Sequence, residues 1–103
     1  MTVREDLEMR LQELPLLTRR KSRFGDSHAY FLAEREIAHF HGDDRMDVRL
    51  TKERIRELKA AGPLDPRVQT RGPSADWAAV RVSVESDLAL AIELVEEAIR
   101  ANS

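Results

Sequence analysis

The sequence of 103 residues contains no cysteine. This absence excludes a disulfide framework, a thiolate nucleophile and the zinc and iron–sulfur sites that are built from thiolates. Any metal ion would have to be held by histidine, aspartate or glutamate. From composition alone we expect no cofactor.

Long apolar runs and a strong charge bias are also lacking. A transmembrane helix needs about 20 predominantly apolar residues, and the N-terminal stretch MTVREDLEMRLQEL mixes charged and apolar residues in a way that no signal peptide does. The formal net charge is −2, with basic and acidic residues scattered along the chain. We therefore expect a cytoplasmic protein that has neither a membrane nor a nucleic acid as partner.

The chain is short enough for one domain, residues 1–103, because folded units typically contain about 100–150 residues. Three segments have the apolar spacing of amphipathic helices. The first, 3–14, follows a capping box formed by Thr2 and Glu5. The other two helices are expected at 52–61 and 87–101.

Between these helices the apolar period changes to two, which predicts strands. Three of them form a meander at 28–32, 36–41 and 46–50, a short leading strand is expected near 16–18 or 22–24, and later strands near 68–71 and 77–84. The order α-β-β-β-α-(β)-β-α indicates an α+β fold, a largely antiparallel sheet with helices packed on one face.

Side chains alternate across a strand, so the facing of each residue can be predicted. Pairing Leu32 with Arg35, or Ala33 with Glu36, gives the same result. In both registers Ala29, Phe31, Ala38 and Phe40 would face the helices, as would Ala78, Val80 and Val82. The other face would carry a ligand-binding set of polar and aromatic residues: His28, Tyr30, His39, His41, Asp47, Arg49, Trp77 and Arg81.

This polar face has several interpretations. Its residues could be ordinary cross-strand pairs, each worth about 0.2–1 kcal/mol. Tyr30 and Trp77 favour a small-molecule or protein partner, because large aromatic side chains on an uncovered sheet face usually pack over other residues or contact a ligand. If Phe40 pairs with Val48, His41 faces Asp47 as a minimal acid–base pair.

Catalysis and metal binding are the chemical alternatives. The catalytic candidates are His39, His41 and Asp47, but no serine, phosphate-binding or dinucleotide motif specifies a reaction. His39 and His41 lie about 6–7 Å apart on one strand face and could chelate a metal with Asp47 or His28. Such pairs are common by chance, so our expectation is that no metal binds. Burial of the face in a homodimer is the structural alternative.

Three stretches, REIAHFHGDDRMDVRLT, RIRELKAAGPLDPRV and RGPSADWAAVRV, resemble the luciferase-like domain family of small bacterial proteins. The resemblance covers roughly residues 22–100. The residues that match the recurring marks of the family are His39, His41, Asp47, Pro73, Ser74 and Trp77. The family implies a domain of essentially unknown function, and only its name suggests luciferase or monooxygenase activity. We expect little room for the ~300–1,000 Å³ apolar cavity that a drug-sized ligand usually needs.

Overall fold

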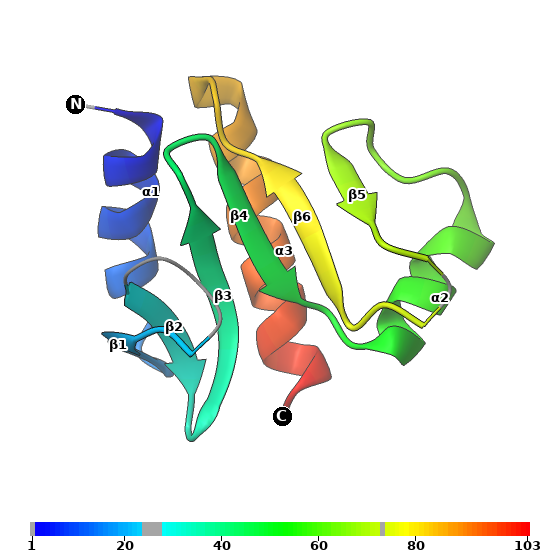
Figure 1. The fold of residues 1–103 in the computed structure, drawn as a ribbon, viewed down its shortest axis with the longest axis horizontal. Helices are drawn as coiled ribbons and strands as arrows, with labels where there is room; N and C mark the ends of the chain where they lie inside the picture. Colours follow the sequence, from blue (N-terminus) through cyan, green and yellow to red (C-terminus); the bar gives the residue numbers. More distant parts are fainter. Residues whose placement is uncertain (1, 24–27, 73) are drawn as a thin grey trace.

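A computed structural model of the chain describes residues 2–23, 28–72 and 74–103 (Figure 1). The elements, in chain order, are α1 (Val3–Gln12), β1 (Leu17–Lys21), β2 (His28–Leu32), β3 (Arg35–His41), β4 (Arg45–Arg49), α2 (Lys52–Ala61), β5 (Val68–Thr70), β6 (Trp77–Arg81), the short 3₁₀ helix η1 (Glu85–Asp87) and α3 (Leu88–Ala101). This order confirms the α+β prediction. The leading strand is β1, which overlaps the first of its two expected positions, and Phe24 of the second lies outside the described residues.

The six strands form one sheet in the order β1-β2-β3-β4-β6-β5, and every neighbouring pair is antiparallel. Figure 1 shows α3 crossing behind β4 and β6, and α1 packs against α3 on that side. The edge strand β1 carries Arg19, Arg20 and Lys21, and the opposite edge strand β5 has three residues. Charged or very short edge strands discourage pairing with another sheet.

Local signals in the sequence explain the helices. The Thr2–Glu5 capping box is present at the start of α1, and the Thr51 hydroxyl accepts a hydrogen bond from the Arg54 amide at the start of α2. The apolar stripe of α3 is buried, as expected. No helix in the described part of the chain is long and apolar enough to cross a bilayer.

The core lies between the helices and one face of the sheet. Leu7 and Leu11 of α1 are fully buried there, and the facing predicted for β6 is confirmed, since Ala78 and Val80 are at most 1% exposed. Val82, just beyond β6, is also fully buried. Burial of each of the larger aliphatic side chains stabilises the folded state by about 1.5–3 kcal/mol. No helix formed by the described residues covers the opposite sheet face, where His39, His41 and Asp47 lie.

The hairpin of β2 and β3 departs from regular alternation. Leu32 pairs with Arg35 and Phe31 with Glu36, as one predicted register had it, but Tyr30 then pairs with Ala38. Ile37 is the additional residue of a β-bulge, and an extra residue exchanges the faces beyond it. The predicted facing of Ala29, Tyr30 and Phe31 was therefore wrong, and Ala29 lies on the face of its partner His39.

The consequences of the bulge are seen in the burial of these side chains. Tyr30 and Ile37 belong to the core cluster together with Ala38 and Phe40. Phe31 instead lies outside that cluster, where the guanidinium of Arg20 sits 4.2 Å from its ring centroid. Because of the bulge, Tyr30 lies in the core and Phe31 lies on the opposite face of the sheet.

The pairing of β3 with β4 also differs from the prediction, by two residues. Phe40 pairs with Met46 and not with Val48, because the turn closes at the His41–Arg45 pair, where Gly42 adopts a φ of 67°. A shift of two residues leaves the facing unchanged. It moves Asp47 directly opposite His39, where Arg49 was expected.

Candidate functional site

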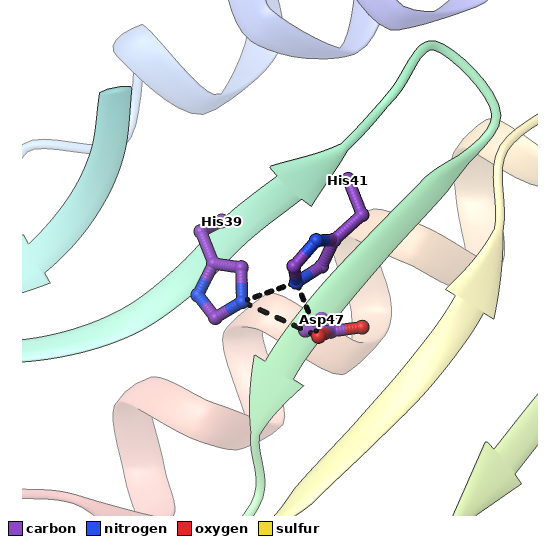
Figure 2. A group of neighbouring side chains, drawn as sticks. All are labelled: His39, His41 and Asp47. Carbon is purple, nitrogen blue, oxygen red and sulfur yellow. Dashed lines mark hydrogen bonds and ion pairs between the residues drawn. The ribbon is translucent and has the colours of Figure 1, made fainter. Parts of the chain in front are cut away.

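His39, His41 and Asp47 form a compact cluster on the sheet face that bears no helix (Figure 2). The Nε2 atoms of the two histidines are 3.1 Å apart, and Oδ2 of Asp47 lies 3.3 Å from Nε2 of His39 and 3.0 Å from Nε2 of His41. Alternation along β3 points both imidazoles to one side, and the β3–β4 register brings the carboxylate between them. Three atoms that commonly bind metals therefore converge on one point.

A fourth residue, Glu36, contacts His39 at the ring nitrogen that does not face His41 and Asp47. Its carboxylate is 2% exposed, and Oε2 lies 2.9 Å from Nδ1 of His39. The Ser22 hydroxyl donates to Oε2 and the Arg23 amide donates to Oε1, at 2.8 and 2.7 Å. When His39 carries its proton on Nδ1, the lone pair on Nε2 faces the cluster, and when Nε2 carries the proton, His39 donates to Asp47.

Sequence reasoning missed Glu36. Glu36 is the first residue of the predicted strand 36–41, where regular alternation would put it and His39 on opposite faces. Only the bulge at Ile37 brings them to the same face. An acidic residue three positions before a histidine on a predicted strand was the one available signal.

The electrostatic surroundings keep Asp47 ionised. Burial alone would raise the pKa of this carboxyl, but a hydrogen bond with His39 and the charges of Arg45 and of both histidines outweigh burial and lower the pKa below 3.8. Nε of Arg45 lies 3.2 Å from Oδ1 of Asp47. The cluster therefore holds a negative charge next to two imidazoles.

Trp77 covers one side of the cluster. Its ring centroid is 4.7 Å from that of His39, and the guanidinium of Arg49 lies 4.8 Å from the indole centroid. Asp76 holds Arg49 from the other side, with Oδ2 3.4 Å from Nε. The indole is thus fixed between a cation and an imidazole.

A groove of about 510 Å³ runs over this face, and we call it the Trp77 groove. Its volume lies within the range of small-molecule sites, but it is an open groove with several charged and polar lining residues, and not the apolar cavity for which we expected little room. The lining residues are His39, His41, Arg45, Asp47, Gln69, Thr70, Arg71, Ala75, Asp76, Trp77, Ala78 and Ala79.

The structure brings together five of the eight residues expected in the ligand-binding set. His39, His41, Asp47 and Trp77 line the groove, and Arg49 holds Trp77. The other three lie elsewhere.

Tyr30 is in the core, and His28 is an exposed residue on the same face of β2 as Tyr30, so both were assigned to the wrong face. Arg81 has the predicted facing, but its guanidinium binds Asp87 at 3.3 Å and does not line the groove. Of the family marks, Ser74 is exposed in the loop before β6, and Pro73 lies outside the described residues.

The comparisons with known proteins give one result. The family model of the luciferase domain matches residues 34–98. No curated protein and no solved structure matched the chain. The matched segment begins at the β2–β3 turn and includes His39, His41, Asp47 and Trp77, and it covers more than half of the sequence. The chain therefore belongs to the luciferase domain family.

Proposed function

We propose that the chain binds a small organic ligand in the Trp77 groove, with a planar part of the ligand against the indole and an acidic group near Arg71. The observation that carries this proposal is a large aromatic side chain held rigidly in a groove of about 510 Å³ beside a polar cluster. Pockets that take small molecules combine apolar surface with a few converging polar groups.

The lining of the groove supports a planar ligand. Ala75, Ala78 and Ala79 are small residues around Trp77, and they leave the indole accessible from the groove. An aromatic ligand stacked on an indole gains about 0.5–1.5 kcal/mol beyond its buried area. Since Arg49 and His39 already fix the indole, little side-chain entropy is lost on binding.

Charge supports the acidic group. Arg45 and Arg49 are engaged with Asp47 and Asp76, at 3.2 and 3.4 Å. Arg71 also lines the groove, is exposed, and forms no ion pair within 2–23, 28–72 and 74–103. The Arg71 guanidinium can therefore form a bidentate ion pair with a carboxylate or phosphate group of a ligand in the groove.

Benzoate and its uncharged analogue benzyl alcohol provide the test. The chain has one tryptophan, so a single indole N–H resonance reports on the groove. We expect both compounds to shift this resonance, and Arg71→Gln to weaken benzoate binding several-fold without affecting benzyl alcohol. Arg56→Gln, which removes the same charge from an exposed position on α2, is the matched control. An indole resonance that neither compound shifts would contradict the proposal.

A second function, acid–base catalysis on the bound ligand, is favoured by one observation. His39 lies between two carboxylates, Glu36 at 2.9 Å and Asp47 at 3.3 Å, an arrangement suited to holding and passing a proton. The family name, which suggests an enzyme, agrees with this alternative. If it is correct, His41→Gln would still bind a ligand that the unmodified chain converts, but would not convert it.

A further inference from the structure

Three atoms that can each donate a lone pair to a metal converge within the cluster: Nε2 of His39, Nε2 of His41 and Oδ2 of Asp47. When His39 carries its proton on Nδ1 toward Glu36, its Nε2 lone pair and Oδ2 of Asp47 face each other at 3.3 Å. A cation that lies between these two acceptors stabilises the arrangement, as a proton on Nε2 does when no metal is bound.

The separations match those between neighbouring ligands of one metal ion. Zinc binds histidine nitrogen and carboxylate oxygen at about 2.0–2.2 Å, so adjacent ligand atoms lie about 3.0 Å apart in octahedral and about 3.4 Å apart in tetrahedral geometry. The three edges of the cluster measure 3.1, 3.3 and 3.0 Å. A single ion above this triangle would reach all three atoms without movement of the strands.

Glu36 provides a second, independent observation. Histidines that bind metals usually have a carboxylate or carbonyl at the other ring nitrogen, which fixes the tautomer and makes the ligand more basic. Glu36 occupies that position at Nδ1 of His39 and is itself held by Ser22 and by the Arg23 amide. A carboxylate that is 2% exposed, behind a histidine that is 3% exposed, is costly to bury unless it has such a task.

We infer that His39, His41 and Asp47 bind one divalent first-row transition-metal ion, with Glu36 as the carboxylate that positions His39. Two imidazoles favour zinc, iron(II), cobalt(II) or nickel(II) over magnesium and calcium, which prefer ligand sets made of oxygen. This inference concerns the floor of the Trp77 groove and is independent of the organic ligand proposed for it.

The remaining coordination positions would face the groove. No fourth histidine, aspartate or glutamate joins the three ligands among the residues that the structure describes. Three protein ligands and an open side are typical of catalytic zinc sites, and two histidines with one carboxylate on one face are typical of non-haem iron(II) sites. A bound ion would thus be accessible to a ligand lying on Trp77.

The test uses untagged, metal-free protein and the metal ions alone. Cobalt(II) is titrated while its visible absorption and the Trp77 fluorescence are recorded, and zinc is titrated by calorimetry. We expect one ion per chain, with quenching of the indole by cobalt because Trp77 lies against His39. Asp47→Asn and His41→Asn should each weaken binding at least ~10-fold, and Glu36→Gln by roughly 10–100-fold.

His28→Asn is the matched control, since His28 is the third histidine of the chain and is exposed on the other side of the sheet. It should leave the affinity unchanged. The inference is overturned if no ion binds at micromolar concentration, or if His28→Asn weakens binding as much as His41→Asn does. Nitrogen NMR of the unmodified chain with zinc removes any dependence on variant folding, because only His39 and His41 should then shift. A shift confined to His28 would equally overturn it.

Discussion

Oε2 of Glu36 lies 2.9 Å from Nδ1 of His39, although the two residues are three positions apart on one strand. In a regular strand they would face opposite sides of the sheet. The bulge at Ile37 puts both on the face with Asp47 and buries Ile37 itself in the core. A backbone irregularity thus places a buried carboxylate beside His39 of the cluster.

Replacing Glu36 by glutamine tests how strongly this carboxylate is held. The glutamine side chain would keep the size of the original but lose the charge that Ser22, the Arg23 amide and His39 surround. Hydrogen bonds to charged groups contribute about 1.5–3 kcal/mol, so we expect Glu36→Gln to lower the free energy of unfolding by about that amount. Urea denaturation followed by Trp77 fluorescence measures it.

Glu34→Gln is the control for this substitution. Glu34 lies in the turn of the same hairpin, its side chain is 86% exposed, and its ion pair with Arg20 is 3.5 Å long. Exposed pairs of this kind contribute little, so the denaturation midpoint should stay where it is. Equal effects of the two substitutions would show that Glu36 has no special role in stability.

Much of the fold could be predicted because its signals are local. The capping residues Thr2 and Thr51 and the change of apolar period at His28 each act within a few residues of the boundary that they mark. The bulge could not be predicted, since nothing in the composition of 28–41 distinguishes a regular hairpin from one with an additional residue. Tertiary packing of Tyr30 and Ile37 against the helices decides between the two.

The site was predicted in part for a geometric reason. The error in the β3–β4 register was an even number of residues, so His39, His41 and Asp47 kept their common face. The error in the β2–β3 register was odd, and it moved His28 and Tyr30 to the wrong face. The groove depends on the loop before β6 as well, and no periodic pattern specifies the path of such a loop.

The turn between β2 and β3 offers a stabilising substitution. Ala33 adopts a φ of 54°, in the left-handed region that costs most residues other than glycine about 1–2 kcal/mol. Glycine relieves this strain but loses more chain entropy on folding. We expect Ala33→Gly to stabilise the chain by about 0.5–1 kcal/mol, seen as a rise in Tm of roughly 2–6 °C.

Glu34→Gly, one residue later in the same turn, provides the comparison. Glu34 is not among the residues with positive φ, so glycine there brings the entropic cost without relief of strain. Its Tm should fall slightly. A Tm that falls for both variants would mean that Ala33 is not strained.

Tyr30 should titrate abnormally. Burial, with a smaller contribution from the negative charge of Glu8, raises the pKa of its phenol from 10.0 to about 12. The raised pKa means that the folded state disfavours the phenolate, so the stability from Tyr30 is complete below pH 10 and is lost as the pH rises toward 12. Tyr30 is the only tyrosine, and its ultraviolet absorption in the folded chain should change with a midpoint near pH 12.

The unfolded chain in urea is the internal reference for Tyr30, and its midpoint should lie near the ordinary value of about 10. Glu8→Gln removes the negative charge and should lower the midpoint of the folded chain. The assignment of Tyr30 to the core fails if the folded and unfolded chains titrate together.

Asp87 should dominate the loss of stability in acid. It is fully buried, and although burial alone would raise its pKa, hydrogen bonds from Arg81, Arg67 and the amides of Ser83 and Val84 outweigh burial and hold the pKa far below 3.8. Because the pKa of Asp87 is lower in the folded chain than in the unfolded chain, the ionised carboxylate stabilises the fold above about pH 4, the ordinary pKa of an aspartate. This stabilisation is lost as the pH falls below that value. Asp87→Asn should therefore flatten the dependence of the unfolding free energy on pH in this range.

At pH 7 the same substitution should lower the free energy of unfolding by roughly 2–3 kcal/mol, because it leaves two arginines without their shared buried carboxylate. Asp65→Asn is the matched control: Asp65 also binds Arg67, at 2.9 Å, and its pKa is lowered to about 2 by hydrogen bonds from Arg67, but it is more exposed to solvent. Urea denaturation of the three proteins between pH 2 and 7 should give the smaller change for Asp65→Asn. If Asp65→Asn reduces the dependence of the unfolding free energy on pH below about 4 and Asp87→Asn does not, the acid sensitivity resides in the loop before β5 and not at the start of α3.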